Sequence, residues 1–179
     1  MRIVIIGNSG SGKSTLAARL EREHALARLE LDGIVWEPGL VAVTRPAAAA
    51  RADLAAFVRA NERWVIEGCD GDLAGAALPA ATELLFLNPG REACVANNRR
   101  RPWEPHKYAS AELQDSMLTP LLDWVAGYYA RGAEDPRSYA FHRRLFDGHD
   151  GAKRELVRAD AEQRGSTGAT SDPRSGRRA

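Results

Sequence analysis

One segment near the beginning of the chain limits the possible folds more than any other. Residues 7–14 read Gly-Asn-Ser-Gly-Ser-Gly-Lys-Ser and fit the pattern G-x-x-x-x-G-K-[ST] at every fixed position. The β-branched run 3–6 precedes this segment, and residues 14–24 follow it with Leu16, Ala17 and Leu20 on one helical face. The pattern therefore predicts a buried strand, a glycine loop and an amphipathic helix in direct succession.

Phosphate binding is the chemistry expected of such a loop. Glycines let the backbone curl until successive N–H groups point at an anion, and the positive end of the following helix faces the same point. Lys13 is expected to bridge the β- and γ-phosphates of ATP or GTP as a catalytic residue, and Ser14 is expected to bind Mg²⁺. The predicted nucleotide-binding residues are Gly7, Asn8, Ser9, Gly10, Ser11, Gly12, Lys13, Ser14 and Thr15.

Apolar runs and helical stretches alternate along the rest of the chain. Further strands are predicted at 28–31, 64–66, 83–87 and 155–158. Helices are predicted at 46–61, 91–101, 111–130 and 136–146, and a loop is predicted at 69–79. Such alternation gives βαβ units and a mostly parallel sheet. The expected fold class is therefore α/β, a three-layer P-loop NTPase fold with a central sheet of about five strands and helices on both faces.

Length and charge favour one domain with a separate C-terminal segment. The chain has 179 residues, and its 25 basic side chains nearly balance 24 acidic ones, which argues against a broad nucleic-acid-binding surface. Residues 1–163 are expected to form the nucleotide-binding domain, with residues 98–150 as a lid region. Residues 164–179 contain four arginines, one aspartate and no large apolar side chain, so a disordered basic tail is predicted there.

A cytoplasmic protein is expected from the N-terminal run and the cysteines. Four apolar residues before Gly7 are too few for a signal-peptide core or a membrane span. Cys69 and Cys94 are too few and too isolated for a disulfide framework or a zinc site. We expect a monomer or homodimer whose partners are a nucleotide and a small-molecule acceptor, without a membrane or nucleic-acid partner.

Other nucleotide-binding classes lack their motifs in this chain. A GTPase carries Asn-Lys-x-Asp after a late strand, whereas the run 83–87 is followed by Asn88, Pro89, Gly90 and Arg91. ATP is therefore the expected nucleotide, with Mg²⁺ as its ion. The arginine run 99–101 can close over phosphates and exclude water, which favours phosphoryl transfer over hydrolysis. The alternative for this run is a solvated helix end favoured by the helix dipole.

Four segments in the first hundred residues carry a more specific resemblance. They are RIVIIGNSGSGKSTLAARL at 2–20, LELDGIVWEPG at 29–39, RWVIEG at 63–68 and ELLFLNPGRE at 83–92. On these segments the chain resembles the small-molecule kinases of the adenylate kinase, shikimate kinase and gluconate kinase group. It looks closer still to the adenylate-kinase-like proteins called topology modulation proteins. The resemblance implies transfer of the γ-phosphate of ATP to a small metabolite or nucleotide. A nucleotide-binding regulatory or nucleic-acid-associated protein without kinase activity is the alternative.

The resemblance also implies roles for two acidic residues. Asp32 ends the second strand, where the related kinases place a carboxylate near the acceptor hydroxyl, so it is expected to bind the acceptor and to act in catalysis. Glu67 ends the third strand and resembles the Walker B acid, so it is expected to bind the metal together with Ser14. The related proteins more often carry Asp in place of Glu67, which leaves the reach of this side chain to the metal open.

Further site residues are expected around the acceptor and the lid. Trp36 lies where the acceptor would enter, and it either contacts the acceptor or packs in the core. Arg99 and Arg101 resemble lid arginines that contact phosphate during catalysis. The predicted loop 69–79 has no arginine. A nucleoside monophosphate acceptor would therefore depend on the preceding arginines, Arg45 and Arg51.

Overall fold

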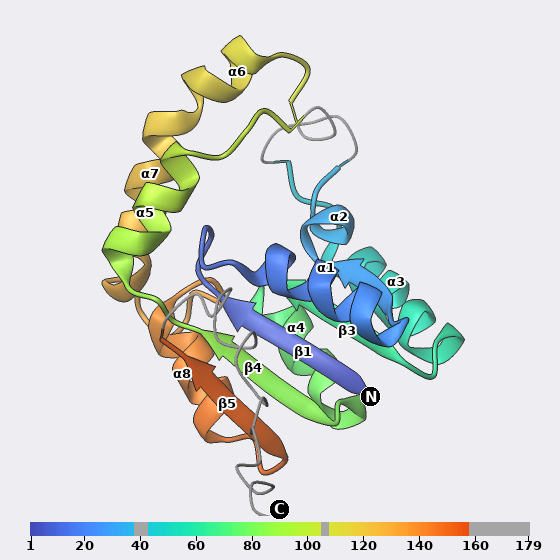
Figure 1. Cartoon of the computed structure of the whole chain (residues 1–179). Coiled ribbons are helices and arrows are strands. Elements are labelled where there is room, and N and C mark those ends of the chain that lie inside the picture. The colour runs from blue at the N-terminus through green and yellow to red at the C-terminus, as the bar shows by residue number, and fades with distance from the viewer. Residues whose placement is uncertain (38–42, 105–107, 158–179) are drawn as a thin grey trace, which may run out of the picture.

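A parallel β-sheet forms the centre of the structure. The computed structural model describes residues 1–37, 43–104 and 108–157, so the predicted tail at 164–179 lies outside the described residues. Five strands lie in the order β2-β3-β1-β4-β5, and every neighbouring pair is parallel (Figure 1). The strands are β1 (Arg2–Gly7), β2 (Ala27–Glu30), β3 (Trp64–Gly68), β4 (Glu83–Leu87) and β5 (Ala152–Leu156). Their carboxyl ends therefore lie along one edge, and the predicted parallel sheet is confirmed.

Helices cover both faces of this sheet. Alternate side chains of a strand point to opposite faces. Val4 and Ile6 of β1 pack in one apolar cluster with side chains of α3, α4 and α8, whereas Ile3 and Ile5 pack in a second cluster with α1. The helices are α1 (Lys13–His24), α2 (Asp32–Val35), α3 (Ala47–Ala60), α4 (Gly71–Ala77), α5 (Arg91–Arg99), α6 (Ala111–Ser116), α7 (Leu118–Ala126) and α8 (Tyr139–Asp147), with 3₁₀ turns η1 (Leu78–Ala80) and η2 (Gly127–Tyr129). The three-layer α/β fold is confirmed.

None of the helices in the described part of the chain is long and apolar enough to cross a membrane.

An arm of three helices extends from the sheet at the edge where its strands end. α5 and α7 pack along one another, and α6 lies at the far end of the arm (Figure 1). α8 instead packs against β1 and β4, and its Tyr139 and Phe146 belong to the first apolar cluster. The range 98–150, predicted as a lid, therefore contains both part of this arm and a helix that covers the sheet.

The segment 69–79, predicted as a loop, forms α4 and η1 instead. Asp70 caps α4, because its side chain accepts a hydrogen bond from the backbone N–H of Leu73 at 3.1 Å. Leu73, Ala74 and Ala77 of α4 are buried. Alanine is the best helix former, so the alanine content that suggested a loop stabilises a short buried helix.

The predicted helix 111–130 is broken into α6, α7 and η2. Pro120 lies in the first turn of α7. Proline has no backbone N–H, and its ring would clash with the carbonyl of Ser116 in a continuous helix. The chain therefore turns between Ser116 and Leu118, and a new helix begins.

Two short elements near the carboxyl edge of the sheet also differ from the prediction. β5 begins at Ala152, three residues before the predicted 155–158, and its pairing with β4 aligns Leu156 with Leu87. α2 was not predicted; it starts at Asp32 directly after β2 and buries Ile34 and Val35. Asp32 is thereby held at the edge of the sheet where the glycine loop lies.

Candidate active site

The loop between β1 and α1 adopts the curled conformation that its glycines permit. Gly10 and Gly12 have φ angles of 74° and 96°, in the left-handed region that other residues avoid. A Cβ atom on Gly10 would lie 2.3 Å from Nδ2 of Asn98, so no larger residue fits there. The loop leads into the amino end of α1, where the helix dipole favours an anion. The predicted succession of strand, glycine loop and helix is confirmed.

Lys13 lies buried at the start of α1. Its Nζ donates hydrogen bonds to the backbone oxygen of Asn8 at 2.9 Å and to Sγ of Cys69 at 3.3 Å. Burial alone would lower the pKa of Lys13, but its neighbours Cys69, Glu67 and Asp32 have the larger effect and raise this pKa. Lys13 therefore keeps its positive charge at neutral pH.

Glu67 lies near Lys13 at the end of β3 and is 1% exposed. Its Oε1 atom has no hydrogen-bond donor among the described residues. Burial raises the pKa of Glu67, while the charge of Lys13 and a hydrogen bond from Ser14 lower it in part. A buried carboxylate oxygen is costly unless a donor or a cation meets it. The structure thus brings the two predicted metal ligands, Glu67 and Ser14, into contact.

A cavity of about 610 Å³ joins the loop to the edge of the sheet. This volume falls within the range of small-molecule sites in proteins. The predicted site residues that line it are Ser9, Gly10, Ser11, Gly12, Lys13, Ser14, Thr15, Asp32, Glu67 and Arg101. Within the described ranges, Gly7, Asn8, Trp36 and Arg99 are not part of its lining. Asp32 and Arg101, far apart in the sequence, therefore border the same space as the glycine loop.

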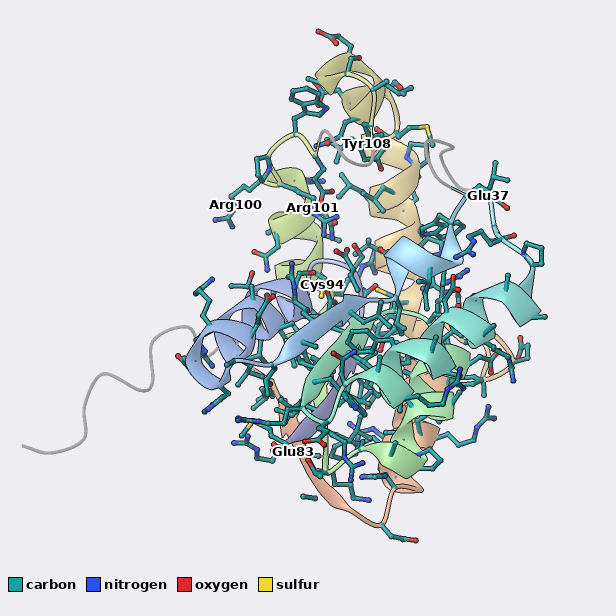
Figure 2. All side chains as sticks on the ribbon, turned by 90° about the vertical axis from the view of Figure 1, so that its right-hand side faces the viewer. Glu37, Glu83, Cys94, Arg100, Arg101 and Tyr108 are labelled. Atoms are coloured by element: carbon teal, nitrogen blue, oxygen red, sulfur yellow. The ribbon has the colours of Figure 1, made fainter. Side chains whose placement is uncertain are left out.

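The arginines at the end of α5 differ in where they lie. Arg101 lines the cavity, and its Nη1 lies 3.2 Å from Oε2 of Glu104. Arg100 lines the cavity as well, and Figure 2 shows both side chains at the end of α5. Arg99 is exposed and borders, together with Arg100, a separate shallow depression beside Glu92. Arg100 and Arg101, rather than Arg99, are therefore the arginines of this run that face the cavity.

Trp36 is not part of the cavity lining that the described residues form, and it makes packing contacts instead. Its half-buried ring packs against the first apolar cluster, and the guanidinium of Arg137 lies 5.0 Å from the ring centroid. These contacts agree with core packing, which is one of the two alternatives predicted for Trp36 from the sequence. Arg45, a candidate for holding an acceptor phosphate, is ion-paired with Asp53 at 2.8 Å. Trp36 and Arg45 are thus engaged with the protein itself, whereas Asp32 lines the cavity.

Long-range contacts that the sequence did not predict hold the glycine loop in place. The side chain of Asn8 is buried, and its Nδ2 donates to the backbone oxygen of Val125 in α7 at 3.0 Å. Asn97 of α5 donates to the backbone oxygen of Gly10 at 2.9 Å. The only sequence signal for these contacts is the pair of asparagines at 97 and 98. Asn is a poor helix former, so its presence in a helix indicates a role other than helix stability. The loop is thus fixed by both helices at the base of the arm.

The turn after β3 is held by a fully buried histidine of α8. Nε2 of His142 lies 3.0 Å from the backbone oxygen of Cys69, and Nδ1 lies 2.6 Å from the hydroxyl of Tyr128. A carbonyl oxygen can only accept, so Nε2 carries the proton and Nδ1 accepts from Tyr128. Burial lowers the pKa of His142 to about 4. His142 is therefore neutral near pH 7 and serves to hold this turn.

Comparison with known proteins adds likeness in fold alone. No protein-family model matches the sequence, and no curated protein matches it. The structure is similar to a sugar kinase from a Janibacter species, with 17% identity, 86% of this chain and 83% of that chain covered, and a TM-score of 0.48. It is also similar to deoxyadenosine kinase from M. mycoides, with 11% identity, 87% and 90% covered, and a TM-score of 0.45. A shikimate kinase from Aquifex aeolicus shares 18% identity over 87% of this chain and 86% of that chain, with a TM-score of 0.45. The chemistry of the site therefore has to be argued from its own residues.

Proposed function

We propose that the protein is a kinase that binds ATP with Mg²⁺ at the glycine loop and transfers the γ-phosphate to a small-molecule acceptor. One observation carries this proposal: a buried lysine, a hydroxyl and a carboxylate oxygen without a donor among the described residues meet beside one glycine-lined cavity. These groups are Lys13, Ser14 and Glu67. Phosphate oxygens would replace Asn8 and Cys69 as partners of Lys13, and a metal ion would meet the carboxylate of Glu67.

The side chains fit a metal ion that is bound together with the nucleotide. No group of three or more His, Cys, Asp or Glu side chains within the described ranges is arranged to hold a metal by itself. Mg²⁺ keeps several water ligands and takes one or two protein oxygens together with phosphates. Ser14 would supply a hydroxyl ligand, and Glu67 would hold the ion directly or through a water. When bound, the ion neutralises charge on the β- and γ-phosphates.

Each cavity residue has a separate task in phosphoryl transfer. Lys13 holds the oxygens of the β- and γ-phosphates, and Arg100 and Arg101 approach them from the segment that follows α5 and exclude water. Asp32 orients the acceptor hydroxyl and takes its proton. The acceptor oxygen then bonds to the γ-phosphorus, the bond between that phosphorus and the bridging oxygen breaks, and ADP leaves.

Replacement of Lys13 tests the proposal. In Lys13→Met, acceptor-dependent ADP release should fall by about 100-fold or more, because a preorganised cation is lost from the transferring phosphate. The assay should screen nucleosides, nucleotides, sugars and sugar acids as acceptors. Lys153→Met is the matched control, since Lys153 lies on β5 and donates to the backbone oxygen of Asp147. The control should retain turnover, and both variants should melt within a few degrees of the wild type.

The alternative makes the opposite prediction in the same experiment. A regulatory protein without kinase activity would bind ATP with Mg²⁺, which equilibrium dialysis measures, but no acceptor would raise ADP release above the basal rate. That result would refute the kinase proposal. Wild-type turnover in Lys13→Met would contradict the role given to the glycine loop.

A further inference from the structure

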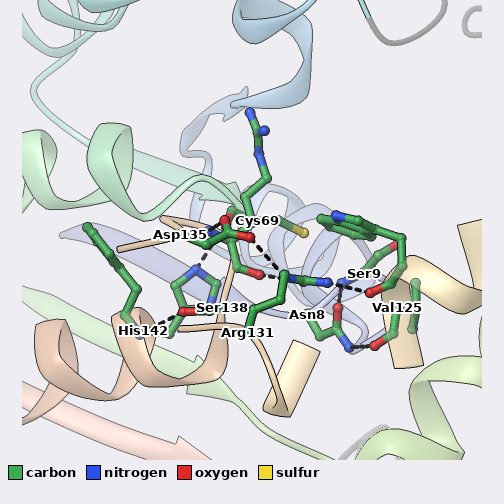
Figure 3. A network of polar contacts seen from close by, with 11 residues as sticks. Asn8, Ser9, Cys69, Val125, Arg131, Asp135, Ser138 and His142 are labelled. Carbon is green, nitrogen blue, oxygen red and sulfur yellow. Dashed lines mark hydrogen bonds and ion pairs between the residues drawn. The ribbon is translucent and has the colours of Figure 1, made fainter. Parts of the chain in front are cut away.

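One side of the phosphate site is fixed by the end of α7. Lys13 donates to the backbone oxygen of Asn8 at 2.9 Å, and the side chain of Asn8 donates to the backbone oxygen of Val125 at 3.0 Å. Oδ1 of Asn8 also accepts from the backbone N–H of Ser9 at 2.8 Å, so both ends of this amide are engaged (Figure 3). The position of the glycine loop therefore depends on where the end of α7 lies.

The opposite side of the site is fixed by residues 137–142. Lys13 donates to Sγ of Cys69 at 3.3 Å, and the backbone oxygen of Cys69 is bound by His142 at 3.0 Å. The next residue, Asp70, accepts a hydrogen bond from Nη2 of Arg137 at 2.9 Å. This turn directly follows the end of β3, which carries Glu67. Its position therefore depends on a segment that lies far along the chain.

Arg131 joins these two sides. Nη1 of Arg131 donates to the backbone oxygen of Trp124 at 2.5 Å, and Nη2 donates to the backbone oxygen of Arg137 at 2.6 Å. Nε lies 3.0 Å from Oδ2 of Asp135, and the guanidinium lies 4.5 Å from the centroid of the Trp124 ring. Trp124 directly precedes Val125, the residue that holds the glycine loop. Figure 3 shows Arg131 between the Asn8–Val125 contact and His142.

These contacts form a closed ring that begins and ends at Lys13. We propose that Arg131 is a positioning residue of the phosphate site, which sets the place of Lys13 relative to the turn after β3. For its effect on catalysis, this inference rests on the proposed kinase function. Arg131 is not part of the lining of the cavity formed by the described residues, so it acts through the residues it holds. A planar guanidinium suits this position, because its fork donates to two carbonyls in fixed directions, whereas a lysine ammonium does not.

Thiol labelling tests the geometry without an activity assay. Cys69 touches Lys13, whereas Cys94 is 1% exposed and reports general unfolding. In Arg131→Met, N-ethylmaleimide should label Cys69 about fivefold faster or more, because the turn loosens locally, while Cys94 keeps its wild-type rate. Peptide mapping by mass spectrometry separates the two thiols. Arg131→Lys should give an intermediate rate, and it carries the same test if Arg131→Met does not fold.

Arg144→Met is the matched control. Arg144 also donates to a backbone oxygen, that of Ala133, at 3.1 Å and lies 4.7 Å from the ring centroid of Phe141, but it lies outside the ring. This variant should label at the wild-type rates. Unchanged labelling of Cys69 in the variants of Arg131 overturns the proposal. Equal acceleration of both thiols also overturns it, because that result indicates general destabilisation.

A kinetic measurement completes the test. Arg131→Met should lower kcat about tenfold and change KM for ATP by less than about twofold, because the loop backbone still binds phosphate while Lys13 loses its alignment. A rise in KM with unchanged kcat would contradict a positioning role. If the wild type has no kinase activity, the proposed function fails, and the labelling result still decides whether Arg131 holds the site.

Discussion

Acidification should destabilise the protein through one buried histidine. His142 is 0% exposed, and both of its ring nitrogens are engaged, one by Tyr128 and the other by the backbone oxygen of Cys69. Burial lowers the pKa of His142 from its ordinary 6.5 to about 4. In the unfolded chain the imidazole is solvated and regains its ordinary pKa. The unfolded state therefore binds a proton at a pH where the folded state does not.

The sign and size of the effect follow from this difference. Because the folded-state pKa is the lower one, the free energy of unfolding falls as pH decreases from 6.5 towards 4. Between about pH 7.5 and about pH 5, protonation of His142 in the unfolded chain lowers the free energy of unfolding by about 2 kcal/mol. That loss is large for a domain whose total stability is of the order of 5–15 kcal/mol.

Urea unfolding of the wild type and His142→Gln at the two pH values measures the effect. The wild type should lose about 2 kcal/mol more than the variant on acidification. The packing lost in His142→Gln does not affect this comparison, because the change in the free energy of unfolding between the two pH values is measured for each protein separately. The raised pKa of Glu67 acts in the opposite direction, but it does so in both proteins. His24→Gln, at the end of α1, is the matched control and should keep the wild-type loss. An equal loss in the wild type and His142→Gln would refute the reasoning.

Two further predictions concern the glycine loop and its neighbour. Gly10 has a φ of 74°, and a Cβ atom there would lie 2.5 Å from the backbone oxygen of Cys94. Gly10→Ala should therefore lose about 1–3 kcal/mol of stability, and it should lose affinity for ATP with Mg²⁺. Gly33→Ala, where a Cβ would meet nothing within 4 Å, is the control, and equal melting and binding of the two variants would contradict this argument. Burial raises the pKa of Cys69, so its alkylation by iodoacetamide should be slow at neutral pH and accelerate in alkali. Saturating ATP with Mg²⁺ should slow that reaction, and labelling that is insensitive to the nucleotide would contradict the placement of phosphates beside Lys13.

The strand, loop and helix at the start of the chain were predictable because their causes are local. An apolar β-branched run, glycines that permit positive φ and a helical apolar stripe act within a few residues of one another. The errors arose where a local signal had two meanings. Alanine-rich residues 69–79 suggested a loop, yet Asp70 caps them as α4. The periodicity of 111–130 suggested one helix, yet Pro120 prevents a continuous one.

The contacts that complete the candidate site were not predictable, because they join residues far apart in the chain. Asn8 and Val125 are separated by 117 positions, and Asp70 and Arg137 by 67. Arg131 carries no motif, and a single arginine in a sequence is usually a surface residue. The role proposed for it depends on the fold of residues 124–137, which surrounds its guanidinium with two carbonyls and a carboxylate. Pattern reasoning therefore predicted the glycine loop from local signals, whereas the long-range contacts that hold this loop became visible only in the structure.

The same contacts fix the base of the arm to the glycine loop. Asn97 of α5 and Val125 of α7 both hold the glycine loop at the base of the arm, through Gly10 and Asn8. Movement of the base would disturb the loop, so bending is expected beyond these two positions. α5 ends at Arg99 shortly before Pro102, and α6 is separated from α7 near residue 117. Both breaks lie on the far side of the loop contacts. The lid movement predicted for the range 98–150 is therefore expected beyond Asn97 and Val125, where it would leave the contacts of the glycine loop intact.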